Sequence, residues 1–178
     1  MGKKSIKENK KIYQELREEL GYSRKDACDL DEMAGIPEYR LTHIEDQGNP
    51  TPEEVFMMSC AYKKPELCSW FCANECRLGK ETNKSEIRIK DLSNIVLGML
   101  NRLNTMEQTK DRLISITADG DISEDELEEF CTIQDELVKM SDLIETMRVW
   151  TEKMIYDGKI NKEKYEKIKE KHHNSQKK

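Results

Sequence analysis

The sequence predicts an all-α protein, on three observations. The chain of 178 residues contains only eight glycines and four prolines, so few positions break a helix. Lysine, glutamate, leucine and methionine are frequent, whereas valine and tyrosine are scarce. Apolar residues recur at three- and four-residue spacing along most of the chain. We therefore expect a five-helix helix-turn-helix domain followed by a long antiparallel helical hairpin with a short terminal helix.

The first two helices are predicted from an apolar stripe and two breaks. Residues 6–20 place their apolar side chains on one side of a helix, and Gly21 ends that pattern. Ser23 then begins the second helix, with Asp26 three residues later in the acidic position of a capping box. The second helix is expected over residues 23–34.

A glycine and a proline separate the second helix from the third. Gly35 ends the second period, and Pro37 stands in the first turn of a helix expected over residues 37–47, where proline is tolerated. Two short helices joined by a glycine-containing turn form a helix-turn-helix. The third helix is expected to bury Ile36, Leu41 and Ile44 and to expose Glu38, Arg40, His43 and Gln47.

Two further helices complete the N-terminal part. Thr51 is placed as an N-cap with Pro52 at the first helical position, and Pro65 separates this fourth helix from a cysteine-containing fifth helix that ends at Gly79. The predicted domain covers residues 1–79. A polar linker over residues 80–85 follows it.

With these breaks and spacings, residues 11–67 resemble the Cro and phage-repressor type of helix-turn-helix domain, also called the XRE type. Members of that family have a serine-capped helix with a small inner residue, a Gly-Val-Ser turn and a recognition helix that ends in Ile-Ser-x-Ile-Glu. The corresponding residues here are Ser23, Cys28, Gly35-Ile36-Pro37 and Leu41-Thr42-His43-Ile44-Glu45. About three extra residues, near one helical turn, stand between Ser23 and Pro37.

The resemblance implies a sequence-specific DNA-binding transcription regulator whose partner is double-stranded DNA. Two-fold dimers that read half-sites are usual for such proteins, so a homodimer formed through the C-terminal helices is expected. The side chains expected to contact phosphates are Arg24 and Lys25, and those expected to approach base edges or donate hydrogen bonds there are Glu38, Tyr39, Arg40, Thr42, His43 and Gln47.

The charge balance supports a second interpretation. Through residue 64 the chain has eleven lysines and arginines against thirteen aspartates and glutamates, and its overall net charge is −6. A DNA-binding face normally sets several lysines or arginines against phosphates. The alternative is a protein-interaction module that keeps the helix-turn-helix as a scaffold and binds a protein partner through the hairpin.

Three cysteines recur at four-residue spacing in the predicted fifth helix. Thiolates of Cys68, Cys72 and Cys76 are candidate ligands of zinc or an iron–sulfur cluster. An unbroken helix spreads them too far for one ion, so either the helix ends near Asn74 or the bound group is a larger cluster. The alternative is that they pack as small apolar residues beside Trp70 and Phe71. The N-terminus shows no secretory signal, so reduced thiols in a cytoplasmic protein are expected.

The C-terminal part, residues 86–178, is expected to form the hairpin domain with a basic tail. Residues 87–118 carry a coiled-coil-like stripe with one polar member, and a second long stripe follows Ser123. The first stripe consists of Leu92, Val96, Met99, Leu103, Met106, Lys110 and Leu113.

Several classes of function are disfavoured by what the sequence lacks. Its longest apolar run is too short to span a membrane. No phosphate-cradling glycine loop is present, and no nucleophile is paired with a base at motif spacing. We therefore expect a protein that is not an enzyme.

Overall fold

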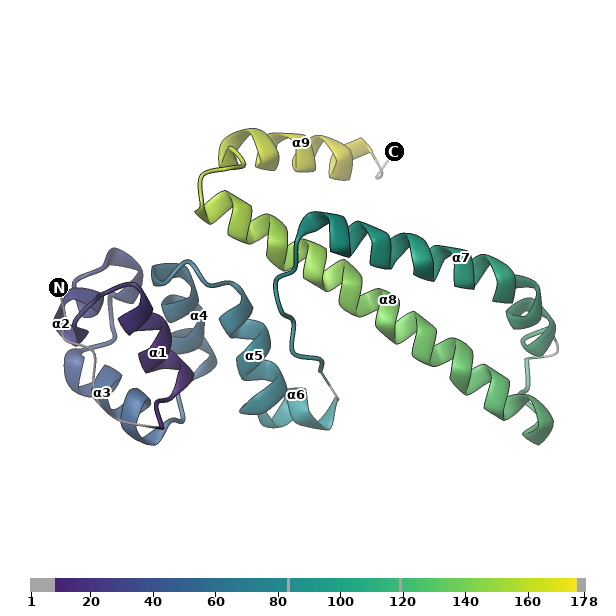
Figure 1. The fold of residues 1–178 in the computed structure, drawn as a ribbon, viewed down its shortest axis with the longest axis horizontal. Coiled ribbons are helices and arrows are strands. Elements are labelled where there is room, and N and C mark those ends of the chain that lie inside the picture. The colour runs from purple at the N-terminus through teal and green to yellow at the C-terminus, as the bar shows by residue number, and fades with distance from the viewer. Residues whose placement is uncertain (1–8, 83, 119, 176–178) are drawn as a thin grey trace. The chain divides into compact units, whose positions relative to one another are not determined.

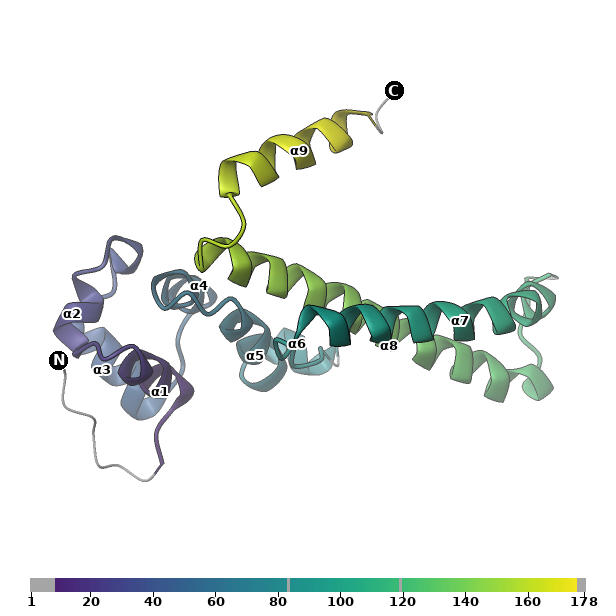
Figure 2. The same cartoon turned by 45° about the horizontal axis from the view of Figure 1, so that its top comes forward.

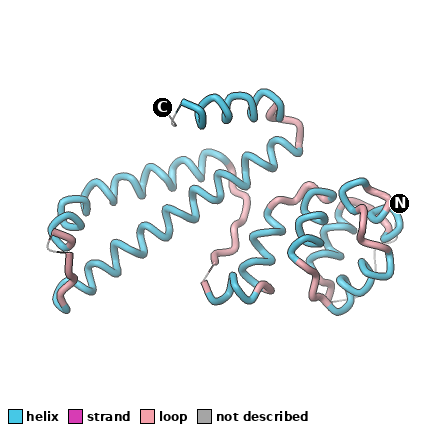
Figure 3. The backbone as a smooth tube through the Cα atoms, turned by 180° about the vertical axis from the view of Figure 1, so that it is seen from behind, coloured by secondary structure: helices cyan, strands magenta, loops and turns pink. Residues whose placement is uncertain are grey.

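The computed structural model describes residues 9–82, 84–118 and 120–175, and these residues form helices and loops with no strand among them (Figures 1 and 3). The expectation of an all-α protein is confirmed. The helical elements, in chain order, are α1 (Ile12–Glu19), α2 (Arg24–Cys28), the 3-10 turn η1 (Asp31–Met33), α3 (Glu38–Gln47), α4 (Pro52–Ala61), α5 (Glu66–Asn74), α6 (Arg77–Glu81), α7 (Leu92–Ile116), α8 (Glu124–Tyr156) and α9 (Lys162–Ser175).

The chain divides into two units. The first contains the described residues up to Glu86 together with those from Lys153 onward, and the second is Ile87–Glu152. Within the first unit, the end of α8 contacts the last turn of α4 and the segment that follows it. The Lys153 ammonium donates to the carbonyl of Lys63 at 3.1 Å, and the Tyr156 hydroxyl lies 3.4 Å from the sulfur of Cys60.

One apolar cluster holds α1 to α5 together. Tyr13 of α1 is fully buried, and Trp70 of α5 meets its ring edge-on with 6.0 Å between ring centroids. The other large side chains that are less than 2% exposed in this cluster are Met33, Leu41, Ile44, Val55, Met58, Tyr62 and Leu67. Ala27 of α2 is also fully buried in this cluster, so every element from α1 to α5, η1 included, contributes to the same core.

The predicted helix starts at Ser23 and Thr51 agree with the structure. Both residues form capping boxes, in which the hydroxyl accepts from a backbone N–H three residues later and the carboxylate at that position accepts in return. Gly21 has φ +76° and Gly35 has φ +109°, backbone angles that residues other than glycine rarely adopt.

Two predicted helices are shorter in the structure than expected. The first helix begins at Ile12, although a helix from residue 6 was predicted; residues 6–8 of that prediction lie outside the described residues. The second was predicted over residues 23–34, but α2 ends at Cys28. Leu30 has an extended backbone, with ψ 139°, and the chain resumes as η1. The extra turn thus forms a separate short element and does not lengthen α2.

The predicted fifth helix is divided into α5 and α6. Helix α5 ends at Asn74. Cys76 then has an extended backbone and forms the N-cap of α6. The two short helices approach closely at Gly79, where a Cβ atom would lie 1.9 Å from the carbonyl oxygen of Cys72. Only glycine fits between these two segments of backbone.

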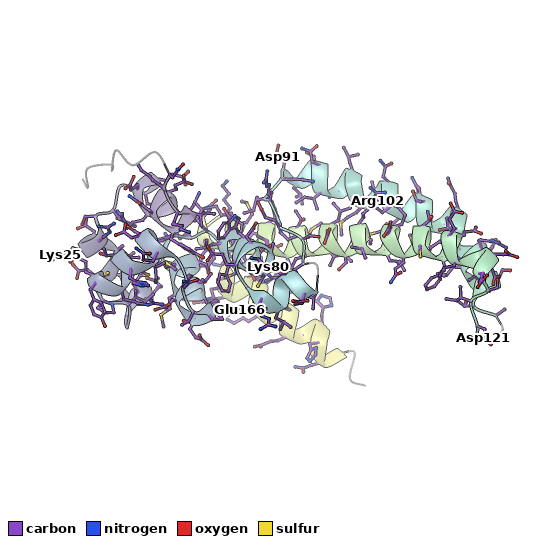
Figure 4. All side chains as sticks on the ribbon, turned by 90° about the horizontal axis from the view of Figure 1, so that it is seen from below. Lys25, Lys80, Asp91, Arg102, Asp121 and Glu166 are labelled. Atoms are coloured by element: carbon purple, nitrogen blue, oxygen red, sulfur yellow. The ribbon has the colours of Figure 1, made fainter. Side chains whose placement is uncertain are left out.

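In the second unit, α7 and α8 lie side by side and antiparallel (Figures 1 and 2). Gly98 of α7 lies against Leu143 of α8. Farther along, Arg102 pairs with Glu136, and Arg112 pairs with Glu129 at 2.7 Å; Arg102 is labelled in Figure 4. These contacts set the register of the hairpin.

The coiled-coil-like stripe predicted on α7 coincides only in part with the buried side of this helix. Leu92 and Val96 are each 39% exposed and Leu103 is 56% exposed. The buried side of α7 instead begins at Ile95 and ends at Ile116, both with no exposed surface. Between them, Met99, Arg102, Met106, Thr109 and Leu113 are half-buried at the alternating spacing of a helix–helix seam.

The close approach at Gly79 predicts a large effect of one methyl group. Gly79→Ala should lower the free energy of unfolding of the first unit by about 1–3 kcal/mol, because backbone must move to admit the Cβ atom. Trp70 fluorescence in a Trp150→Phe background reports this unfolding, since the chain has two tryptophans. The matched control is Leu78→Ala, whose side chain is 72% exposed and should change stability by less than about 0.5 kcal/mol. Equal stability of the Gly79→Ala and wild-type proteins would contradict the packing of α6 on α5.

Candidate nucleic-acid interface

The candidate interface is the outward side of α3. Leu41, Ile44 and Glu45 are buried and fix the inner side of this helix. The outward side exposes Glu38, Tyr39, His43, Asp46 and Gln47, with Thr42 half-buried. Helix α3 therefore has one side held in the core and one polar side in solvent.

A buried ion pair attaches α3 to α1. The guanidinium of Arg17 donates two hydrogen bonds to the carboxylate of Glu45, at 2.6 and 2.9 Å. The Glu45 side chain has no exposed surface, and that of Arg17 is 6% exposed. Burial lowers the pKa of Arg17, but the hydrogen bonds and the negative charge of Glu45 outweigh it and raise the pKa above its ordinary value. Burial and then the charge of Glu45 also raise the pKa of Tyr62 nearby.

The two cations expected at phosphates differ in their surroundings. Arg24 donates to the second oxygen of Glu45 at 2.8 Å and lies 3.9 Å from Asp46. Its side chain is 31% exposed, so it neutralises the Glu45 carboxylate from the solvent side. Lys25 is exposed on the outside of α2 (Figure 4). Of these two, only Lys25 presents its charge to solvent without a carboxylate hydrogen-bonded to it.

Arg40 is also held by a carboxylate. Its guanidinium donates to both oxygens of Glu54 on α4, at 2.6 and 2.7 Å, and to the carbonyl of Asn49 at 3.1 Å. The hydrogen bonds from Arg40 lower the pKa of Glu54 below its ordinary value, and those bonds also raise the pKa of Arg40. A guanidinium in this fork has few N–H groups left for a base edge.

The uncharged members of the predicted set lie along the exposed side of α3. Tyr39 is 78% exposed. The Thr42 hydroxyl donates to the carbonyl of Glu38 at 2.8 Å, within the helix. His43 Nδ1 lies 3.3 Å from the Arg40 guanidinium, and Gln47 is exposed at the last position of α3. The structure thus brings the six predicted α3 residues onto one helix, with Arg24 and Lys25 on the preceding one.

The partners of the predicted cations are absent from the predicted set. Arg24 and Glu45 are 21 residues apart, and Arg40 and Glu54 are 14 residues apart. Neither separation matches a helical neighbour spacing, so no local pattern indicates these pairs. The only signal was the acidic balance of the domain, which shows that carboxylates are available but not which cation each one binds.

The three predicted metal ligands do not come together as a site. The break after Asn74 removes the objection that an unbroken helix would spread them. Nevertheless, within the described residues no group of three or more His, Cys, Asp or Glu side chains is placed to hold a metal ion. Cys68 donates to the Ser59 hydroxyl at 3.3 Å, and both Cys68 and Cys76 pack against the apolar cluster. Cys72 is exposed as a residue, but partial burial of its thiol is the main cause that raises its pKa. The nearby Cys76 raises the pKa of Cys72 further.

Comparison of the chain with protein-family models, with curated proteins and with solved structures gave no match. In the part of the chain that the structure describes, no helix has both the length and the apolar character needed to cross a bilayer.

Removal of one partner of the buried pair should be costly. Arg17→Met leaves the Glu45 carboxylate buried with Arg24 as its remaining partner, and we expect the free energy of unfolding to fall by about 3 kcal/mol. The double variant Arg17→Met/Glu45→Leu removes both charges of this pair and should recover most of this loss. Urea unfolding followed by Trp70 fluorescence measures both. A double variant less stable than Arg17→Met would contradict this account.

The Arg40–Glu54 pair predicts a pH-dependent contribution to stability. The pKa of Glu54 in the folded protein is below its ordinary value of 4.5, so the unfolded chain takes up a proton first as the pH falls. The stability that wild type gains over Arg40→Gln should therefore be fully present above pH 4.5 and decrease below it. Urea midpoints of the two proteins between pH 7 and pH 3 measure this difference. A difference that is constant or that grows toward pH 3 would show that the pair does not act through Glu54.

Proposed function

We propose that the first unit binds double-stranded DNA through the exposed side of α3 and acts as a sequence-specific transcription regulator. The observation that carries this proposal is that α3 is fixed on its inner side by the Arg17–Glu45 pair while its outer side presents hydrogen-bonding side chains. A helix of this kind fits the major groove, where base edges offer a distinct pattern of donors and acceptors.

Recognition would depend on neutral hydrogen-bonding groups. Gln47 can pair with the N6 and N7 atoms of adenine, and His43 and Tyr39 can donate to guanine or phosphate oxygens. Arg24 and Arg40 are held by Glu45 and Glu54, so phosphate contacts would be few. The affinity would then depend weakly on salt, with about one to two phosphate contacts and a slope of log K against log salt concentration of roughly −1 to −2.

A second candidate function is a protein-interaction module. The observation that favours it is charge: the exposed side of α3 carries Glu38 and Asp46, and its single cation, Arg40, is already bonded to Glu54. Acidic helix surfaces repel phosphates and suit a basic protein partner.

Selection of bound duplexes from a random pool at low salt tests the proposal. We expect one enriched motif, and we expect Gln47→Ala to weaken binding to it by about 1–3 kcal/mol, tenfold or more, because one bidentate base contact is lost. The matched control is Gln108→Ala, an exposed glutamine on α7 that should leave the affinity unchanged. If no motif is enriched from a folded protein, the DNA-binding proposal fails and the protein-interaction function is favoured.

A further inference from the structure

The second unit has a small core for its length. Across Ile87–Glu152, the apolar residues that are less than 9% exposed are Ile87, Ile95, Ile116, Ile133 and Val149. Its helix–helix seam also contains polar members, among them the Arg102–Glu136 pair and Thr109. Helical hairpins of this length normally bury a second side of each helix against further helices.

A stripe of exposed apolar side chains runs along α7 beside the seam. At 3.6 residues per turn its members lie within an arc of about 80°, which begins roughly 60° from Ile95. They are 39–61% exposed and consist of Leu92, Val96, Leu100, Leu103 and Ile114.

Helix α8 carries a matching stripe. Leu127, Leu137 and Ile144 are 52%, 44% and 56% exposed, and Phe130 is half-buried between them. Phe130, Leu137 and Ile144 follow one another at seven-residue spacing, as along one side of a coiled coil. On each helix, viewed from its N-terminus, the exposed stripe lies clockwise of the side that packs against the other helix. Because α7 and α8 are antiparallel, the two stripes lie on the same side of the hairpin.

The charge of this apolar face identifies the kind of partner that it fits. Its charged members on α7 are Glu107 and Lys110, and these pair with each other at 3.0 Å. On α8 the positions between the apolar members are Gln134 and Ser141. At the two ends of the stripe, Glu126 accepts hydrogen bonds from Ser123, and Glu145 pairs with Arg148 at 2.6 Å. Apart from Glu126, which is bonded to Ser123, the charges of this face pair within their own helix, so the face offers little net charge to an acidic or basic partner and a copy of itself would meet little like-charge repulsion.

The size of the face also suits a dimer. A stable interface buries about 800 Å² on each partner. Eight large apolar side chains that are each roughly half exposed, together with the polar residues around them, provide most of such an area. This is more than the scattered single apolar residues that a monomer normally exposes.

We propose that a second copy of this chain covers the apolar face formed by these two stripes, so that two hairpins pack face to face as a four-helix bundle. Four helices around one apolar core are the common way to bury both sides of a helical hairpin. The dimer goes beyond the proposed function, because it depends only on the second unit and not on DNA.

Light scattering of the full chain at tens of micromolar tests the dimer. Wild type should have twice the 20.9 kDa mass of one chain. Leu103→Glu places a charge in the middle of the face and should give a mass of one chain. The matched control is Leu97→Glu, because Leu97 is 62% exposed on the far side of α7, and this variant should stay dimeric.

A second variant guards against loss of folding in Leu103→Glu. Lys110→Glu changes a residue whose side chain is 54% exposed, so α7 should still fold. The added negative charges repel each other across the dimer, and salt screens this repulsion. The dimer of this variant should therefore dissociate at a higher protein concentration in low salt than in high salt. A wild-type mass of one chain would overturn the proposal. So would dissociation of Leu97→Glu equal to that of Leu103→Glu.

The two proposals fail in different ways. A monomeric wild type that still selects a DNA motif refutes the dimer and leaves DNA binding intact. A dimer that selects no motif refutes DNA binding and leaves the dimer intact. A dimer that selects an inverted repeat supports both, because two-fold symmetry in a protein matches two-fold symmetry in its site.

Discussion

The bidentate ion pair between Arg17 and Glu45 is the interaction on which the candidate interface depends. A carboxylate with no exposed surface must have its charge compensated within the protein, and here Arg17 from α1 and Arg24 from α2 both do so. One side chain of α3 is thereby bonded to the two helices before it in the sequence. Buried pairs of this kind are weak evidence for high stability, because desolvation offsets much of the attraction. What this pair does provide is geometry, since a rotation of α3 would break three charge-assisted hydrogen bonds together.

The same bonds change the electrostatics of the exposed side. Arg24 donates to Glu45 and Arg40 donates to Glu54, so two of the three lysines and arginines predicted to contact DNA, Arg24, Lys25 and Arg40, are already neutralised by carboxylates of the same unit. A guanidinium that is hydrogen-bonded to a carboxylate of the fold is not free for a phosphate, so folding and the proposed DNA binding would compete for the same groups. Under that proposal, the exposed side of α3 would have to rely on neutral donors and acceptors.

Local features of the structure could be predicted from the sequence, and long-range ones could not. The caps at Ser23 and Thr51 depend on residues three positions apart, and the turn at Gly35 depends on one residue, so a short window contains the cause. The end of α2 at Cys28 gave no comparable signal, because no glycine or proline stands between Cys28 and Gly35. The predicted stripe of α7 coincides only in part with the side that packs against α8, for a different reason. Two neighbouring stripes of α7 are both apolar, and only contacts with α8, such as Leu143 on Gly98, distinguish the inner one.

That ambiguity has a physical meaning of its own. A helix with two apolar stripes has two surfaces to bury, and α8 covers one of them. If a second copy covers the other, each dimer also carries two copies of α3. A unit with about one to two phosphate contacts would bind DNA weakly alone, since each contact contributes one released counterion. Linking two such units makes the second binding event intramolecular and can raise the affinity by about 10²–10⁴ without any new contact. The exposed stripe of the second unit and the neutralised arginines of the first are then complementary features, because dimerisation would supply the affinity that the charges of α3 do not.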